Sequence, residues 1–430
     1  MSQQLQRTIS IPQGVALYMG AVVGAGILLL PGLAADQAGP ASLISWAFLC
    51  VMAIPLAFTF AKLASRTPDA GGVLTYVTDA FGPIAGMIMG WYYWFAAATA
   101  QGFVALTGAF HVAPQGGLGR HGTFGVAAAI LLAATAINLL GLKVGGRLQL
   151  LFVGTVVTLL LVTIFAAIPR FAVANFSPFA PEGLGVVGSV GVVIFIGFVG
   201  WEAISHLSQE FRDPERAIMR STVISVGAII VLFLSVATAT IGTATYGERA
   251  ANDTSIGQML SDSFGRSAET VVAVIVLFIA LGTTNAFVAA TSRLGYALAR
   301  DGMFPRPLSR LNTRQVPGVA ISVVGGWALG ALTVNHVTGS GIEMLIVLPN
   351  SLVLIVYLAA TVAAVRLLSG WQRTLPLVGT AMVATLLPFA GIALTAPAIV
   401  AALALAYWYR YHRSARTADV PPIVAERRHP

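Results

Sequence analysis

The chain has 430 residues, of which 57% are hydrophobic and only 9% are charged. A soluble domain carries roughly 25% charged residues, so this composition excludes a soluble globular protein. One bilayer-spanning helix needs about 20 apolar residues, and the chain holds enough of them for about twelve. The net charge of +8 is spread in small groups between apolar runs, which indicates membrane topology rather than nucleic-acid binding.

Twelve apolar runs predict twelve membrane-spanning helices, and none shows the two-residue alternation of a membrane β-barrel. We therefore expect an all-helical polytopic membrane protein. The predicted spans cover residues 14–34, 41–61, 83–110, 123–142, 148–168, 188–208, 221–245, 268–298, 317–334, 342–365, 374–394 and 396–409.

The basic residues predict the orientation of the chain. With the N-terminus in the cytoplasm, 20 of the 24 Lys and Arg residues fall on the cytoplasmic side, where membrane proteins concentrate them. The four exceptions are Arg120, Arg170, Arg249 and Arg266. Both termini are therefore predicted inside, with residues 1–10 as a short segment and residues 412–430 as a basic, disordered tail that contacts anionic lipid. Only two of the 24 are Lys, which is typical of a GC-rich bacterial genome. We expect the protein to lie in a bacterial inner membrane.

Glycines interrupt two of the predicted spans. Gly24 and Gly26 lie in the first span, and Gly197 and Gly200 lie in the sixth. With five spans in each half, these are the first helices of the two halves, and such matched breaks point to the central site of an inverted-repeat transporter. Free N–H groups at one half-helix suit a carboxylate, and unwound carbonyls of the other helix suit an ammonium group. The alternative is that the glycines only allow close helix packing, as we expect for Gly82, Gly86 and Gly90.

These motifs resemble those of the amino acid–polyamine–organocation transporters. Gly24-Ala-Gly-Ile-Leu28 is similar to the family's break in span one, and Phe198-Val-Gly-Trp-Glu202 to its break in span six. Further similar segments are Pro68–Gly72 with Tyr76, Glu210–Arg216, and Ser292–Gly302 with Pro305. The resemblance covers nearly the whole chain. Within the family, the length of the chain and its segment Glu202-Ala-Ile-Ser-His206 most resemble those of the bacterial branch that exports methionine and branched-chain amino acids.

The resemblance implies a LeuT-type fold with alternating access around a site at the membrane midplane. Residues 11–168 and 188–366 are then inverted repeats of five spans, and residues 373–411 hold two additional helices. The implied substrate contacts are Gly24, Ala25, Gly26, Ile196, Gly197, Phe198, Gly200 and Asn285. Ile196 stands where many family members have an aromatic gate. For Asn285, a hydrogen bond between helices is the alternative.

Glu202 is the only carboxylate deep inside a predicted span. An ionisable group there is costly enough to indicate function, and we predict that it couples transport to protons. The alternative, which does not exclude the first, is that it binds free backbone N–H groups of the broken helices. His206 lies one turn further on the same helix face, where we predict that it relays a proton. The alternative is that it is a packed or interfacial histidine without a role in coupling.

The substrate is predicted to be a neutral amino acid. Away from their first residues, where Glu269 and Glu343 stand, spans eight and ten carry no acidic residue for a cationic side chain, and span three carries none at all. No buried Arg or Lys awaits a second carboxylate. We therefore expect leucine, isoleucine, valine or methionine, exported by the proton motive force. Sodium bound by Thr283, Thr284 and Ser292 is the alternative to protons. Import, exchange, and sensing without transport remain open.

Other classes of protein lack support in the sequence. No P-loop, zinc-protease motif or nucleophile elbow is present, and a single buried carboxylate cannot form an aspartyl-protease pair. Cys50 is the only cysteine, which excludes a disulfide framework and a thiolate cluster. We expect no enzymatic activity, no cofactor and no metal site.

Overall fold

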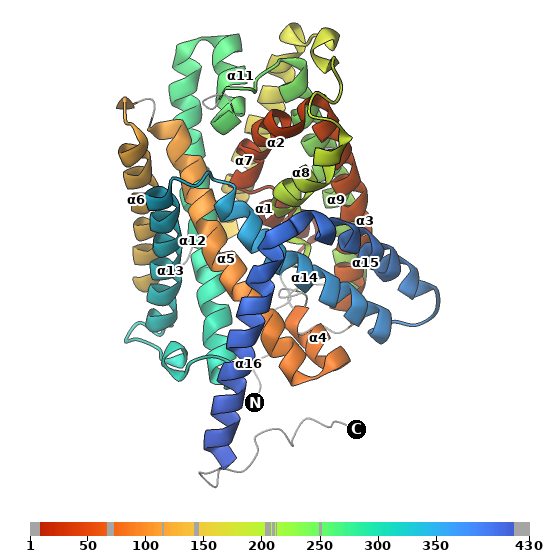
Figure 1. Cartoon of the computed structure of the whole chain (residues 1–430), viewed down its shortest axis with the longest axis vertical. Helices are drawn as coiled ribbons and strands as arrows, with labels where there is room; N and C mark the ends of the chain where they lie inside the picture. The colour runs from red at the N-terminus through yellow and green to blue at the C-terminus, as the bar shows by residue number, and fades with distance from the viewer. Residues whose placement is uncertain are drawn as a thin grey trace.

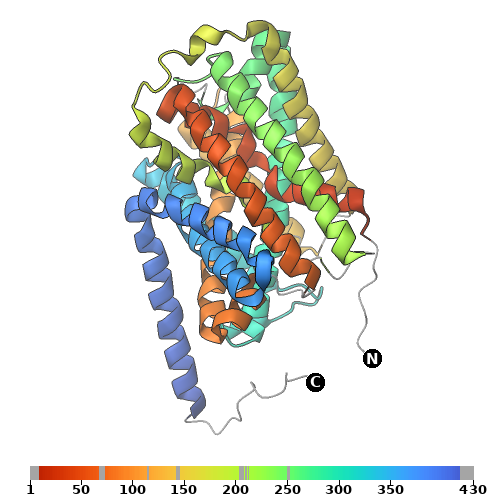
Figure 2. The same cartoon turned by 90° about the vertical axis from the view of Figure 1, so that its right-hand side faces the viewer.

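The computed structural model describes residues 9–66, 73–113, 116–141, 146–202, 208, 211, 213–248 and 252–416. These residues are helical, apart from turns, connecting segments and one isolated β-bridge between Ile9 and Phe211. The long helices run obliquely along the length of the molecule (Figures 1 and 2). The predicted loop motif 68–72, His206 and the end of the predicted tail, residues 417–430, lie outside the described residues.

Nine stretches of the described chain are long and apolar enough to cross a membrane. They are Leu30–Arg66, Pro83–Val112, Arg120–Leu139, Leu150–Arg170, Pro214–Gly242, Ser267–Arg300, Gly318–Thr338, Met344–Leu367 and Gly370–Tyr411. Two shorter apolar helices, Ile11–Val22 and Leu184–Phe198, accompany them. The expectation of an all-helical, multi-pass membrane protein is confirmed.

The first half of the chain comprises α1 (Ile11–Val22), η1 (Ala25–Leu28), α2 (Leu30–Ala38), α3 (Ser42–Arg66), α4 (Val73–Phe81), α5 (Pro83–Val112), α6 (Arg120–Leu139) and α7 (Gly146–Ala167). The second half comprises α8 (Val187–Ile194), η7 (Phe195–Phe198), α9 (Pro214–Gly242), α11 (Ser255–Phe264), α12 (Arg266–Arg300), α13 (Gly318–Thr338) and α14 (Met344–Leu367). The chain continues through α15 (Thr374–Leu386), η11 (Leu387–Leu394) and α16 (Thr395–Arg416). Helix α16 thus continues beyond residue 409, where the last span was predicted to end.

A matching turn leads into the second long helix of each half, α5 and α12. Helix α4 meets α5 at Gly82, with φ 91° and ψ 172°, and α11 meets α12 at Gly265, with φ 85° and ψ 172°. Glycine adopts such positive φ values without the strain that a side chain would add. Figure 1 shows α4 and α11 at opposite ends of the molecule. The same motif at opposite ends is the pattern that two inverted repeats produce.

Helix α5 lies at the centre, against α6, α12 and α14, while α3 and α9 lie side by side (Figure 2). A Cβ added at Gly90 of α5 would lie 2.8 Å from the Leu298 side chain of α12, so glycine permits the close approach of these helices. This contact confirms close packing for Gly90. The same expectation is wrong for Gly82, where an added Cβ would meet nothing within 4 Å and the positive φ of the turn is what favours glycine.

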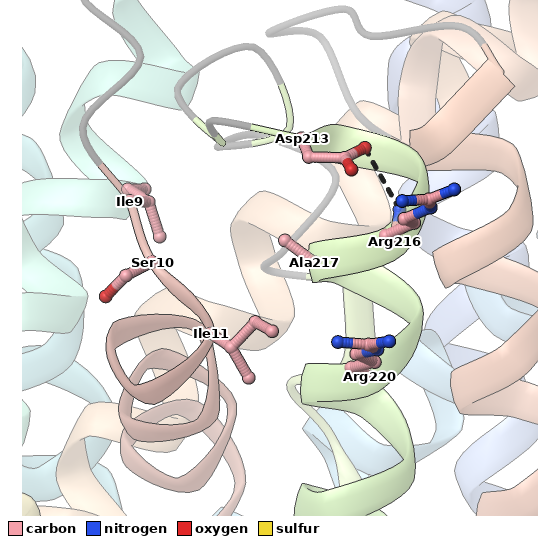
Figure 3. Close-up of a pocket in the computed structure, with 7 residues that line it drawn as sticks. All are labelled: Ile9, Ser10, Ile11, Asp213, Arg216, Ala217 and Arg220. Atoms are coloured by element: carbon pink, nitrogen blue, oxygen red, sulfur yellow. Dashed lines mark hydrogen bonds between the residues drawn. The ribbon is translucent and has the colours of Figure 1, made fainter.

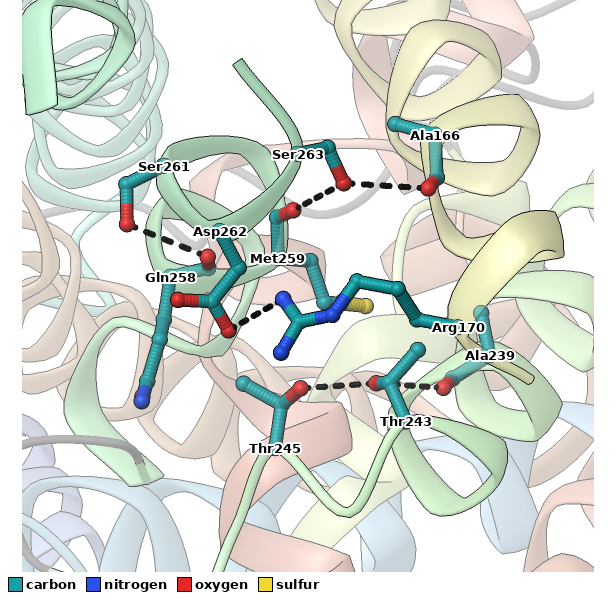
Figure 4. Close-up of polar contacts among 10 residues, drawn as sticks. All are labelled: Ala166, Arg170, Ala239, Thr243, Thr245, Gln258, Met259, Ser261, Asp262 and Ser263. Carbon is teal, nitrogen blue, oxygen red and sulfur yellow. Dashed lines mark hydrogen bonds and ion pairs between the residues drawn. The ribbon is translucent and has the colours of Figure 1, made fainter. Parts of the chain in front are cut away.

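Side-chain contacts attach α11 to the end of α7 (Figure 4). Arg170 forms an ion pair with Asp262 at 2.6 Å, and the Ser263 hydroxyl donates to the Ala166 carbonyl at 3.0 Å. Both charged side chains are partly exposed, so the ion pair contributes at most about 1 kcal/mol. These contacts hold α11 across the end of the bundle opposite to α4.

Candidate functional site

The first span is broken where the sequence predicted. Helix α1 ends at Val22, Gly24 is extended (φ −86°, ψ −169°), and the short turn η1 leads into α2. The N–H groups of Gly24, Ala25 and Gly26 donate to no other described residue. An unpaired backbone group at membrane depth costs several kcal/mol unless protein, water or a ligand satisfies it. Three donors are therefore available at the start of the second half-helix.

The sixth span is broken as well, and the two breaks meet. Helix α8 passes into η7, which ends at Phe198, and Gly200 has a φ of +131°. A Cβ at Gly200 would lie 2.7 Å from the carbonyl oxygen of Ala21 in α1, and one at Gly197 would lie 2.9 Å from Leu30 Cδ1. Glycine at both positions thus lets span six approach both halves of span one.

Glu202 binds three hydrogen-bond donors directly beside this contact. The Tyr93 hydroxyl of α5 donates to Oε1 at 2.6 Å, and the Tyr357 hydroxyl of α14 donates to Oε2. The Gly200 N–H lies 3.1 Å from Oε2 and 3.0 Å from the Tyr357 oxygen, and donates to both. Only 1% of the Glu202 surface is exposed. Its carboxylate therefore joins the break to two other helices, as the structural alternative for this residue predicted.

The two tyrosines were not predicted as site residues. Tyr93 is one of four consecutive aromatic residues that together cover every face of the helix, so the sequence offered no means of selecting it. Tyr357 lies two helical turns after Asn350, so the two polar side chains share one face of an apolar helix. This spacing could have identified Tyr357 as a site residue from the sequence.

Asn350 holds the other side of the same break. Its Nδ2 donates to the carbonyl oxygens of Val192 at 2.6 Å and Val193 at 3.1 Å, in the last turns of α8. Asn350 is fully buried, as is Tyr357. Helix α14 therefore binds span six both before and after its unwound segment.

Apolar and hydroxyl side chains border the breaks. A Cβ at Gly26 would lie 3.3 Å from Phe103 Cε1 of α5, and one at Gly24 would lie 3.6 Å from Thr283 Cγ2 of α12. Ile196 is partly buried, whereas Phe198 is fully buried and packs against Phe233, with ring centroids 5.2 Å apart. Helices α5 and α12 thus form walls around the first break.

The remaining predicted polar residues lie elsewhere. Asn285 is 8% exposed and its Oδ1 accepts from Asn138 Nδ2 of α6 at 2.8 Å, which is the interhelical bond that the alternative interpretation describes. Among the residues whose burial the structure describes, Glu202 is the only buried carboxylate and no Lys or Arg is buried. Those residues also contain no group of three or more His, Cys, Asp or Glu side chains able to bind a metal.

Comparison with known proteins places these features in a family. Residues 9–410 match the family described as "Amino acid permease". The chain is 34% identical over 415 residues to an "Uncharacterized amino acid permease YecA" of Bacillus subtilis, covering 95% of this chain and 96% of that protein. It is 28% identical to the "L-methionine/branched-chain amino acid exporter YjeH" of Escherichia coli, over 90% of this chain and 92% of that one. It is also 26% identical to the "Branched-chain amino acid permease BcaP" of B. subtilis, over 77% and 74% of the two chains.

Proposed function

Since the chain belongs to the amino acid permease family, and is therefore a transporter and not an enzyme, we propose that it carries neutral, apolar L-amino acids. The substrates are leucine, isoleucine, valine and methionine, and the direction is export driven by the proton motive force. One observation carries the proposal: two broken spans meet at Gly200 and Ala21, with free N–H groups on one side and a buried carboxylate on the other.

The proposed substrate binds through its own backbone charges. Its carboxylate accepts from the N–H groups of Gly24, Ala25 and Gly26, aided by the positive dipole end of the following half-helix α2. Its ammonium group donates to unwound carbonyls of span six. This arrangement uses both breaks at once, and it explains why the donors of span one need no partner from the protein.

The charge distribution supports a neutral side chain. A buried Lys or Arg side chain of a substrate would need a carboxylate, and Glu202 already accepts from Tyr93, Tyr357 and Gly200. A substrate with an acidic side chain would need a buried cation, and the described residues provide none. The named relatives for methionine and branched-chain amino acids support the same substrate class.

Glu202 is the proposed proton-coupling residue. As a carboxylate it can accept from both tyrosines and from Gly200 N–H, but a protonated carboxyl group must itself donate one hydrogen bond. Protonation therefore forces at least one of these donors to rearrange, which changes how α5 and α14 hold the break. His206 is proposed to relay the proton toward the cytoplasm.

The proposed topology has twelve spans, with both termini in the cytoplasm of a bacterium and the protein in the inner membrane. Two inverted repeats, residues 11–168 and 188–366, are supported by the family, which implies a LeuT-type fold, and by the matched α4–Gly82–α5 and α11–Gly265–α12 turns. The stretches Leu30–Arg66 and Gly370–Tyr411 each contain more than one helix, which reconciles nine stretches with a larger number of spans.

The test is flux through the purified protein in liposomes, with radiolabelled leucine and methionine and an imposed pH gradient. We expect the flux through the wild type to depend on the pH gradient. In Glu202→Gln we expect this dependence to be lost while amino-acid exchange is retained. Glu182→Gln, in an exposed loop, is the matched control and should behave as wild type. Exchange without any gradient response would indicate an exchanger, and binding without flux would indicate a sensor. Unchanged pH dependence in Glu202→Gln would remove the coupling role.

A further inference from the structure

A cavity of about 300 Å³ lies between the beginning of α1 and the beginning of α9 (Figure 3). Ile9, Ser10 and Ile11 form its wall on the α1 side, and Arg216 and Arg220 lie on the α9 side. None of these residues belongs to the breaks or to the hydrogen bonds around Glu202. The cavity is therefore a separate feature from the proposed transport site.

The cavity presents more positive than negative charge. Arg216 and Arg220 are one helical turn apart, both are exposed, and neither forms an ion pair with another described residue. The one carboxylate in the wall is Asp213, whose Oδ1 accepts from the backbone N–H of Arg216 at 3.4 Å and so caps α9 (Figure 3). Two guanidinium groups with free N–H donors favour an anion with several oxygens, and phosphate is the group that arginine binds best.

The surroundings of the arginines are apolar. Ile9 and Ile11 line the opposite wall, and α9 continues beyond Arg220 with the exposed side chains Val223 and Ile224, which are 54% and 51% exposed. Ile224 follows Arg220 by one turn on the same face, and exposed apolar side chains of a membrane-spanning helix face lipid chains. A phosphate at the arginines would thus lie at the end of a lipid-facing stripe.

We propose that this cavity binds the phosphate headgroup of an anionic phospholipid from the leaflet at which α1 begins, with the acyl chains along α9. The bound headgroup would contact both helices at a point where they already touch. Ser221 Oγ of α9 donates to the Ile11 carbonyl of α1 at 3.2 Å, and Gly14 packs against Ser221. Because α1 is one half of the broken first span, the lipid stabilises the position of a helix that borders the transport site.

Native mass spectrometry of the full-length protein in neutral detergent tests the site, with phosphatidylglycerol titrated against phosphatidylcholine. The double variant Arg216→Gln with Arg220→Gln should bind phosphatidylglycerol at least about tenfold more weakly, with phosphatidylcholine binding unchanged. The matched control is Arg310→Gln with Arg314→Gln, another exposed pair at the same spacing, which should stay within about twofold of wild type. Equal losses in the two pairs would overturn the proposal, because the effect would then reflect net charge alone.

Two further measurements complete the test. Ser10→Asp keeps a good helix-capping residue before α1 but adds a carboxylate to the cavity, so it should also weaken phosphatidylglycerol binding while the protein folds normally. Wild-type affinity in that variant would contradict the site. In the second measurement, inorganic phosphate is added at constant ionic strength to the wild type and to the double arginine variant. We expect the midpoint of thermal unfolding to rise no more in the wild type than in the variant. The lipid assignment is overturned if phosphate stabilises the wild type but not the double variant, while phosphatidylglycerol binds the two proteins equally. The site would then bind a soluble anion.

Discussion

The two broken spans differ in how their unwound backbone is satisfied. In span six, Glu202 and Tyr357 accept from Gly200 N–H, and Asn350 donates to two carbonyls before the break. In span one, the N–H groups from Gly24 to Gly26 donate to no other described residue. Both segments are embedded in apolar helices, where an unsatisfied backbone group is costly.

This difference separates two roles within one site. Span six is held by side chains from α5 and α14, so its conformation depends on the state of those side chains, above all on Glu202. In the proposed function, the free donors of span one bind the substrate carboxylate, and the conformation of span one would then depend on the ligand. The proposed coupling between proton and substrate requires two such dependences at one place, and the close approach of Gly200 to Ala21 is the contact through which we propose that they act on each other.

The largest effect is expected from Gly200→Ala. A Cβ at this position would lie 2.7 Å from the Ala21 carbonyl oxygen, and a φ of +131° is essentially restricted to glycine. We expect the midpoint of thermal unfolding in detergent to fall by at least about 5 °C. Gly24→Ala, whose Cβ would make an ordinary 3.6 Å contact with Thr283, should change it by less than about 2 °C. Equal stability of the two variants would show that the breaks do not pack as described.

Gly26→Val should abolish substrate binding in a folded protein. The valine side chain would fill space beside the free N–H groups, where a Cβ already lies 3.3 Å from Phe103. Loss of charge-assisted hydrogen bonds predicts that leucine affinity, measured by radioligand binding, falls at least about 100-fold. Gly227→Val on the exposed side of α9 has free space and should bind as wild type. Wild-type affinity in Gly26→Val would remove span one from the substrate site.

The tyrosines should have smaller and unequal effects. Tyr357→Phe removes the hydroxyl that contacts both Glu202 and Gly200, whereas Tyr93→Phe removes a contact to Glu202 alone. We expect initial rates of pH-driven flux to fall about tenfold in the first variant and about threefold in the second. Phenylalanine retains the packing of the Tyr357 ring on Phe60, with centroids 5.3 Å apart, so protein stability serves as the internal control. Identical rates in both variants and wild type would mean that the hydroxyls do not tune Glu202.

The smallest effects are expected at Asn285. Asn285→Ala and Asn138→Ala both remove the same interhelical hydrogen bond, and each should cost about 1 kcal/mol of stability. If Asn285 is also a substrate contact, as the resemblance implies, only Asn285→Ala weakens leucine binding, by about threefold. Equal leucine affinity in the two variants would assign Asn285 to helix packing alone.

The position of the breaks was predictable because it depends on local chemistry. Glycines at matched places in two apolar spans, followed by a single carboxylate, contradict the ordinary composition of a membrane helix and therefore mark function. The partners of that carboxylate were not predictable in the same way. Tyr93 is selected from four neighbouring aromatics by the rotation of α5 within the bundle, and that rotation is set by its contacts with α12 and α14.

By itself the sequence determined the membrane environment, the helical architecture and the location of both interruptions, because apolar length and backbone hydrogen bonding in lipid leave few alternatives. Only the tertiary structure decided that Glu202 is bound by Tyr93 and Tyr357, that Asn350 holds α8, and that Asn285 pairs with Asn138. These contacts join residues more than 100 positions apart in the sequence. Helix period and composition restrict which face of a helix is apolar, but the facing partner depends on how distant helices pack.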